Sequence, residues 1–391
     1  MKKVLLCTCA LLTLGTSLFA QPQEPQDPPE DPPKQWYEKM DFYADLRFRY
    51  DARKREEFED VFRYRLRAGV EADVNDFLDA GFEFRSGNPR NPVSDNQDFG
   101  GGLGKKDFKL AEVYADFRLA KSFYVVAGKF EHRKYWVVSD MQWDSDVTTE
   151  GFMQRLRLES KGDGVLERLE ASIYQIVLEQ GDEQAAWLLG AQVRPRFKIG
   201  EHDALIVGIG YDYYVDPQLV ADMTFAGELV GNRVTNLLDD SGQLVSDFRI
   251  LTAFAEWRNQ SSTVWPLAVR FFYYKNTGAK NQLGTEIGTG AQGTGTDNDT
   301  GFFFRAAVGG GRNFGELAIR FTYYYSQPDA ILYAYTQSDT SRASNLNGTR
   351  VDFRVAMPAG QSLNFTWYRT KPELGEAATT NRLFVDYVLG F

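Results

Sequence analysis

The sequence has little cysteine, little histidine, no long apolar run after its first residues and no tract of basic residues. Its two cysteines, Cys7 and Cys9, both lie near the start of the chain, and only two histidines are present. A membrane-spanning helix needs about 18 or more consecutive apolar residues, and none follows residue 20. Without a basic tract, the sequence gives no indication of nucleic acid as a partner.

The first twenty residues are typical of a secretory signal peptide. Lys2 and Lys3 precede an apolar segment from Val4 to Leu18, and Ala20 completes a small-residue cleavage pattern. The apolar segment is too short to span a bilayer. We therefore expect cleavage near Ala20, which removes both cysteines and with them any disulfide framework or thiolate metal site. Loss of the two lysines also makes the formal net charge of −10 more negative.

A change in composition divides the rest of the chain into two parts. Residues 21–35 are dominated by proline and acidic residues, which predicts an extended periplasmic spacer. In residues 36–391, about sixteen segments alternate apolar and polar residues, each segment being about ten residues long. That length crosses a bilayer when a strand is tilted. In residues 60–74, for example, three arginines share one face and apolar residues form the other.

The lengths of the connections alternate as regularly as the residues do. Turns such as Asn75-Asp76 separate segments at one end, whereas the connections at the other end are long. Long extracellular loops and short periplasmic turns are typical of transmembrane barrels. The predicted fold is therefore all-β, a closed antiparallel transmembrane β-barrel of about 16 strands. The long connections are 87–107, 133–150, 216–246, 276–300 and 326–348.

Closure and strand number together indicate a function. Every backbone group in hydrocarbon needs an internal partner, so the last segment is expected to pair with the first. A barrel of sixteen strands leaves an aqueous channel. We therefore expect an outer-membrane porin, a passive diffusion channel for small hydrophilic solutes, with outer-membrane lipid around its apolar face. Oligomeric state, monomer or trimer, stays open.

Charged residues are expected on the inner face. Their basic excess favours a mild anion preference, because rings of Arg or Lys favour anions. The alternative is that pairing across the wall cancels most of the field. The pore-lining residues are predicted to include Arg47, Arg49, Arg63, Arg65, Arg67, Glu71, Glu83, Arg85, Asp116, Arg118, Arg155, Arg157, Arg194, Arg196, Arg320 and Arg354.

The connection at 133–150 combines aromatic and acidic residues. It either folds inward and narrows the pore, or caps the barrel with its aromatic residues at the rim. In the first case a constriction would be set by Tyr135, Trp136, Asp140, Trp143, Asp144 and Asp146.

Two stretches resemble a known family. "AGKFEHRKYWVVSDMQWDSDVTTEGF" (127–152) and "YYYSQPDAILYAYTQSDTSRASNLNGTRVDFRVAMPAGQSLNFTWY" (323–368) are similar to the bacterial putative porin family, which is related to alginate-export-type porins. The resemblance implies a β-barrel outer-membrane channel. The final strand also resembles the signal that the outer-membrane barrel assembly machinery reads in a terminal strand. Its residues are Leu383, Val385, Tyr387, Leu389 and Phe391.

Two alternatives to a general pore remain. One is an export channel for an acidic polysaccharide, and the other is a secreted soluble β-protein that binds a ligand with its apolar faces inward. We expect no enzyme, because His132 and His202 fall at opposite ends of the predicted barrel and neither has an evident serine partner. No cofactor and no metal site are predicted.

Overall fold

The computed structural model describes residues 36–390 except 161, 163, 182, 281–282, 286–291 and 294–297. The chain divides into two units, Met1–Glu38 and Lys39–Phe391. Only residues 36–38 of the first unit are described, where the 3-10 helix η1 (Trp36–Lys39) begins. The predicted signal peptide and the predicted spacer therefore lie outside the described residues.

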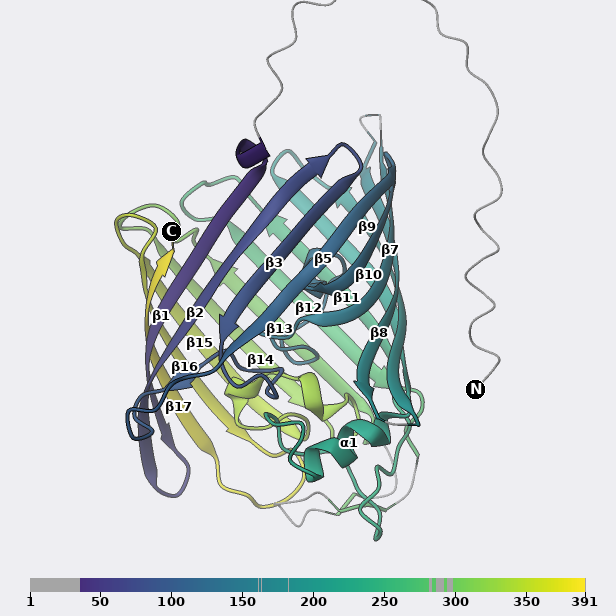
Figure 1. The fold of residues 1–391 in the computed structure, drawn as a ribbon, viewed down its shortest axis with the longest axis vertical. Helices are drawn as coiled ribbons and strands as arrows, with labels where there is room; N and C mark the ends of the chain where they lie inside the picture. The colour runs from purple at the N-terminus through teal and green to yellow at the C-terminus, as the bar shows by residue number, and fades with distance from the viewer. Residues whose placement is uncertain are drawn as a thin grey trace, which may run out of the picture. The chain divides into compact units, whose positions relative to one another are not determined.

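The second unit is a closed barrel of antiparallel strands (Figure 1). Its described sheet has 17 strands, of which sixteen are long and one, β4, has 2 residues. The prediction of about sixteen strands is confirmed. The first nine strands are β1 (Met40–Lys54), β2 (Phe58–Asn75), β3 (Leu78–Ser86), β4 (Gln97–Asp98), β5 (Phe108–Ala120), β6 (Phe123–Phe130), β7 (Thr149–Glu159), β8 (Leu166–Gln180) and β9 (Ala185–Lys198). The others are β10 (Asp203–Val215), β11 (Arg249–Asn259), β12 (Leu267–Asn276), β13 (Thr300–Val308), β14 (Leu317–Ser326), β15 (Leu346–Ala356), β16 (Ser362–Lys371) and β17 (Thr380–Gly390).

The first and last strands close the wall. Leu46 of β1 lies opposite Leu66 of β2 on one side and opposite Leu389 of β17 on the other. The backbone N–H and C=O groups of both edge strands are thus paired. Strands within hydrocarbon need this pairing, because no water is present to bond to a free edge. Phe391, the predicted end of the assembly signal, lies outside the described residues.

The short strand β4 corrects one predicted boundary. Residues 87–107 were expected to form a single external loop. Instead, β3 stops at Ser86, and β4 completes the wall beside β2 by pairing with Arg63 and Tyr64. Part of that connection is therefore wall and not loop.

The two faces of the wall differ as the alternation predicts. Phe62 on the outer face of β2 is 57% exposed, whereas the side chain of Arg65, on the other face, is 13% exposed. Phe271 and Leu383 are further exposed apolar residues on the outer face. An apolar band around a closed barrel is the surface that lipid covers.

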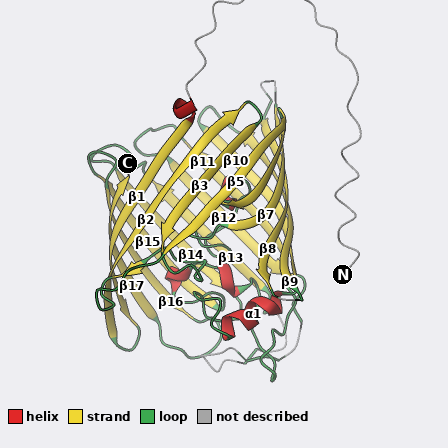
Figure 2. Ribbon diagram, viewed as in Figure 1, coloured by secondary structure: helices red, strands yellow, loops and turns green. Residues whose placement is uncertain are grey.

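A hydrophobic core fills part of the barrel interior, which the sequence analysis did not predict. Trp136, Trp143, Leu238 and Tyr333 come from long loops and are buried in one cluster with wall residues such as Phe272. Figure 2 shows α1 (Pro217–Phe225) and the long loops gathered at one end of the barrel, opposite the short turns. Packed side chains therefore occupy the loop end of the barrel, and an aqueous channel through the barrel stays a prediction.

The sequence signal for this core is a loss of alternation. The stretches "RFFYYK" and "GFFFR" on β12 and β13 have aromatic residues on both faces. Phe271 points outward and is exposed, while Phe272 and Tyr274 are fully buried against the loops. No helix in the described part of the chain is long and apolar enough to cross a membrane.

Candidate functional site

The predicted pore-lining residues lie on the inner side of the wall. In each of their strands they alternate with exposed apolar residues, as Arg63 and Arg65 do with Phe62 in β2 and Arg194 does with Val193 in β9. Their surroundings differ, however. Those on β1, β2 and β3 form ion pairs, except Arg47, which donates to the side chain of Asn96 at 2.6 Å, whereas those on β7 and β9 surround a cavity.

An ion-pair network neutralises the wall where β1 meets β2 and β17. Arg49 donates to Asp386, and Arg382 donates to both oxygens of Asp51 at 2.9 and 2.6 Å. Asp51 also accepts from Arg63 at 2.8 Å. In this part of the wall, carboxylates pair with the arginines and cancel most of their positive field. This agrees with the alternative to an anion preference that the sequence left open.

A loop between β6 and β7, residues 131–148 and hereafter the inward loop, reaches into the barrel. Its Val137 backbone exchanges two hydrogen bonds of 2.8 Å with the side chain of Gln192 on β9. Its Gln142 donates to Asp212 on β10 at 2.6 Å. Contacts with the inner side of several strands show that the loop folds inward and does not simply cap the rim.

Two acidic residues hold the inward loop to opposite walls. Asp146 accepts from Arg67 of β2 at 2.6 Å. Asp140 accepts from Arg305 of β13 and, at 3.1 Å, from Arg133 of the loop itself. Such charge-assisted bonds fix a long loop more firmly than neutral ones.

Buried charge shifts the pKa of these loop carboxyls. Burial alone would raise the pKa of Asp140, but the guanidinium of Arg305 and two further arginines hold it well below its usual range. The arginines around Asp146, with Arg67 foremost, outweigh burial in the same way and lower its pKa. Asp144 is different, because burial and then the nearby charge of Asp146 raise its pKa.

The aromatic residues of the loop are buried and stack on other rings. Trp136 stacks on Tyr174 at a centroid distance of 4.2 Å, and Trp143 stacks on Tyr335 at 5.1 Å. Tyr135 is also buried, and Asp144 accepts from the backbone N–H of Ser338 at 2.8 Å. A constriction stays a prediction. It would be set by the body of the loop, because the named side chains are engaged in contacts.

Two other long loops also enter the barrel, which sequence reasoning missed. Asn236, between β10 and β11, donates to the carbonyl of Ile331, between β14 and β15, at 2.9 Å. Asp329 joins the same two loops, because its carboxylate accepts from the backbone N–H of Leu237 at 2.9 Å and from the hydroxyl of Ser246 at 2.7 Å. The only sequence signal was the run of small polar and apolar residues around Asp329.

A pair of glycines forms the base of the inward loop. Gly128 and Gly151 lie directly opposite each other, with φ of +114° and +151°. A Cβ on Gly151 would lie 2.1 Å from a backbone oxygen of Gln175, so only glycine fits. Beside them, Lys129 and Glu150 form an ion pair of 3.5 Å. The glycine pair and the ion pair together explain why the resembling stretch 127–152 contains Gly128-Lys129 and Glu150-Gly151.

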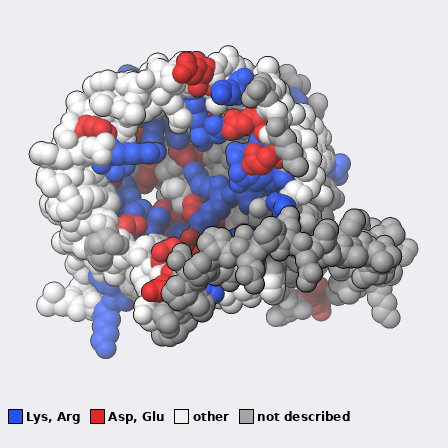
Figure 3. Space-filling view, turned by 90° about the horizontal axis from the view of Figure 1, so that it is seen from above, with Lys and Arg blue, Asp and Glu red and all other residues white. Residues whose placement is uncertain are grey.

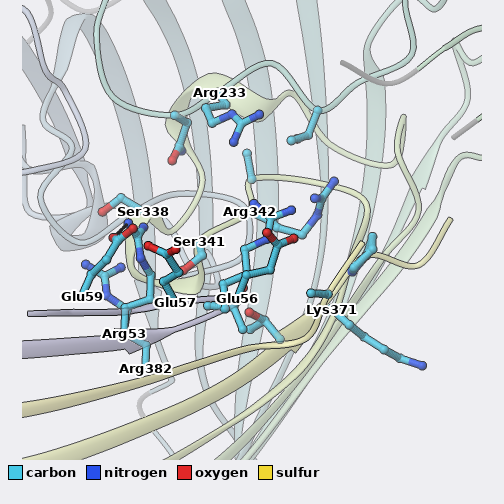
Figure 4. Close-up of a pocket in the computed structure, with 18 of the residues that line it drawn as sticks. Arg53, Glu56, Glu57, Glu59, Arg233, Ser338, Ser341, Arg342, Lys371 and Arg382 are labelled. Carbon is cyan, nitrogen blue, oxygen red and sulfur yellow. Dashed lines mark hydrogen bonds and ion pairs between the residues drawn. The ribbon is translucent and has the colours of Figure 1, made fainter. Parts of the chain in front are cut away.

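The loop end of the barrel contains a pocket of about 610 Å³ with mixed charge (Figure 4). The turn between β1 and β2 contributes Glu56 and Glu57, and the end of β16 contributes Lys371. Arg233 and Arg342 come from the two other inward-folding loops. This pocket therefore has carboxylates facing guanidiniums, with six cations against three glutamates in its lining.

The short-turn end is strongly basic. Figure 3 views the barrel from this end, and Lys and Arg side chains crowd its hollow interior. A cavity of about 410 Å³, hereafter the basic chamber, lies against the inward loop. Sequence reasoning named four of its arginines but missed Arg133 of the inward loop and the arginines on β8, β11 and β12. Its lining is Arg133, Lys134, Trp136, Val137, Val138, Arg155, Arg157, Arg168, Glu170, Arg194, Arg196, Ile206, Glu256, Arg258 and Arg270.

Comparison with known proteins agrees with this architecture. Residues 53–225 match the model of the family described as "Putative porin". The resemblance to porins is confirmed. The match includes the inward loop and its glycine base, whereas the second resembling stretch, 323–368, lies outside it. No curated protein sequence matches the chain. The relation to alginate-export-type porins stays a prediction.

Solved structures of porins share the fold at low sequence identity. The barrel is similar to OmpF of Salmonella typhi, in a complex with daunomycin, with a TM-score of 0.55 and 11% identity over 90% of this chain and 97% of that one. It is similar to a high-pH structure of Pseudomonas putida OprB with a TM-score of 0.55 and 8% identity over 91% of this chain and 95% of that one. Identities this low establish the porin fold and nothing finer.

Proposed function

We propose that the protein is an outer-membrane porin through which small hydrophilic solutes diffuse passively, with a mild preference for anions. The observation that carries the proposal is the contrast between the two faces of one closed wall. Apolar residues such as Phe62 are exposed on its outside, and arginines such as Arg194 lie inside. Lipid favours the first surface and water the second.

The anion preference comes from the short-turn end. On the β1 side, each arginine of the network around Asp51 and Asp386 has a carboxylate partner, so its field is largely cancelled. The basic chamber retains an excess of positive charge. A permeating anion would meet this charge in a partly dehydrated space, where screening is weaker than in bulk water.

The proposed route of assembly rests on the predicted signal peptide and on the closing strand. Cleavage near Ala20 would release the chain into the periplasm, and the closing strand β17 would present its apolar face to the barrel assembly machinery. The soluble alternative does not hold, because it needs the apolar faces inside and the structure exposes them.

Conductance in planar bilayers tests the proposal. Purified protein should form stable channels in KCl, and a salt gradient should give a reversal potential on the anion-selective side of zero. Absence of channels in correctly inserted protein would contradict the porin function. Channels with zero or cation selectivity would leave the porin function standing but would contradict the anion preference. They would also count against export of an acidic polysaccharide.

A further inference from the structure

We propose that the basic chamber is a binding site for compact, multiply charged oxyanions, and that these enter it from the short-turn end of the barrel. The inference rests on the proposed channel function and extends it, because it names a class of solute and the side from which that solute binds.

The position of the lining residues sets the side of entry. Arg157 and Arg196 lie two residues before the ends of β7 and β9, and Arg168 is the third residue of β8. All three strand ends face the short turns. Trp136 and Val138 of the inward loop border the chamber on the other side, where the packed core begins. The chamber therefore opens toward the hollow seen in Figure 3 and is covered toward the loop end.

Charge in the chamber is unbalanced. Eight arginines and one lysine line it, against two glutamates. Four further carboxylates outside the lining bond to these cations: Glu71, Asp140, Glu159 and Glu167. With these included, nine cations face six bonded carboxylates, and the nearby Asp116, whose charge acts on Arg155, is a seventh. An excess that the protein does not neutralise within a concave space favours an anionic ligand.

Two glutamates fix pairs of guanidinium groups in place. Glu170 lies 2.7 Å from Arg194 and 3.5 Å from Arg168. Glu256 has the same role, with Arg270 at 2.7 Å and Arg258 on its other oxygen. Each guanidinium has five N–H donors, so one bond to a glutamate orients the group and leaves donors for a ligand. The chamber is thus preorganised by its few carboxylates.

Arg155 supplies the cation that is hardest to explain without a ligand. It has no ion pair among the described residues, and its Nε is buried without a hydrogen-bond partner. Its guanidinium carbon lies 4.9 Å from the ring centre of Tyr124 and 5.5 Å from that of Tyr135, so two aromatic rings hold it. Its one backbone contact is a long 3.4 Å bond to the carbonyl of Lys134.

The geometry of the donors selects the class of ligand. Guanidinium forks match the planar or tetrahedral oxygens of carboxylates and phosphates, which they bind two bonds at a time. The two fixed arginine pairs and Arg155 provide for more than one such group. A volume of about 410 Å³ lies in the lower part of the range of small-molecule sites, about 300–1,000 Å³. A compact di- or trianion fits this description, whereas a neutral sugar would leave the charges unpaired.

Blockade of chloride current in oriented single channels tests the inference. Orientation is established by a membrane-impermeant maleimide on S241C, which lies in an exposed turn of a long loop. Pyrophosphate and citrate serve as probes with phosphoryl and carboxyl groups. Either probe should block the current saturably when added from the short-turn side. When it is added from the loop side, the concentration that gives half-maximal block should be at least about tenfold higher. Block by one probe and not by the other assigns the group that the chamber prefers.

Matched variants separate a site from a general field. R194Q and R155Q should each raise the half-blocking concentration at least about tenfold. R354Q removes the same charge from the inner face of β15, outside the chamber lining, and should change it less than about twofold. Equal effects of R354Q and R194Q, equal block from both sides, or no block by either probe would overturn the inference.

A binding measurement keeps this test independent of channel activity. Isothermal titration of pyrophosphate into the detergent-solubilised full chain should show saturable heat that R155Q and R194Q weaken and R354Q leaves unchanged. If the protein forms no channels but binds in this pattern, the proposed function fails and the site stands. If channels conduct KCl but neither titration nor blockade responds to the probes, the site fails and the porin function stands.

Discussion

Arg49 of the first strand donates two hydrogen bonds to Asp386 of the last strand, from Nε at 2.7 Å and from Nη2 at 2.9 Å. The guanidinium carbon of Arg49 also lies 3.8 Å from the ring centre of Phe384. This contact joins residues that are 337 positions apart and spans the seam where the barrel closes. The seam is therefore held by a buried ion pair as well as by the backbone ladder.

Removal of one partner should weaken the seam. D386N leaves Arg49 with only Asp339 as a carboxylate partner, and breaking a buried pair costs about 3–5 kcal/mol. Because Asp339 remains, we expect a loss near the lower bound in the free energy of unfolding by urea in detergent. R53Q is the matched control, since its pair with Glu59 is exposed and is worth about 1 kcal/mol at most. Equal losses in the two variants would contradict a special role for the seam.

Asp140 should control the order of the inward loop. D140N deprives Arg305, Arg133 and Arg350 of a shared carboxylate, so the loop loses its anchor on the β13 side. We expect larger fluctuations in single-channel current and a reversal potential shifted further toward anions, because one negative charge has gone. The control is D222N on α1, where the carboxylate accepts only an exposed bond from Gln218 and makes no ion pair among the described residues. Unchanged current noise in D140N would show that the other contacts are enough to hold the loop.

The sequence predicted the wall well because the wall obeys a local rule. A residue in a strand of a membrane barrel faces either lipid or the interior, so alternation identifies strands such as β2 and sides such as that of Arg65. The interior of the loop end obeys no such rule. Asn236 meets Ile331 across 95 positions, and nothing in the local sequence of either residue specifies the other. The same limit applies to the chamber, where Glu256 and Arg270 become neighbours only through the pairing of β11 with β12.

Asp144 predicts an unusual dependence of stability on pH. Burial and the nearby charge of Asp146 raise its pKa, so between the usual value of 3.8 and the raised value the folded chain binds more protons than the unfolded chain. The contribution of Asp144 is therefore fully present below pH 3.8 and is lost as the pH rises through the raised pKa. D144N should flatten this decline. Urea midpoints measured from about pH 4 to about pH 8 would check it, and parallel profiles for D144N and the wild type would contradict the raised pKa.

The opposite sign is expected for Asp140. Its pKa is depressed, chiefly because Arg305 outweighs the effect of burial, so its contribution is present above the usual value of 3.8 and is lost as the pH falls through the depressed value. D140N should therefore be most destabilising near neutral pH and should approach the wild type in acid. The difference in urea midpoint between the two proteins, followed downward from about pH 7, measures this convergence. A difference that grows in acid would be inconsistent with the ion pairs of Asp140.

Asn236 should hold two of the inward-folding loops together. Its side-chain nitrogen donates to the carbonyls of Pro328 and Ile331, and its oxygen accepts from the backbone of Tyr333 at 3.1 Å. N236A leaves these buried groups without partners, at about 1–3 kcal/mol for each. We expect faster hydrogen exchange at Tyr333 and earlier proteolysis between β14 and β15. N313A, in an exposed short turn, is the control and should leave both measurements unchanged.

Adjacent positions on β2 should react oppositely with reagents from water. Leu66 faces outward and Arg65 inward, where it pairs with Asp45 at 2.6 Å. In protein reconstituted into lipid vesicles, a water-soluble maleimide should label R65C and should leave L66C unreacted. Both cysteines should react after unfolding in urea, which controls for intrinsic reactivity. Labelling of L66C but not of R65C would place the apolar face in water, and the membrane barrel and the channel inferred from it would both have to be abandoned.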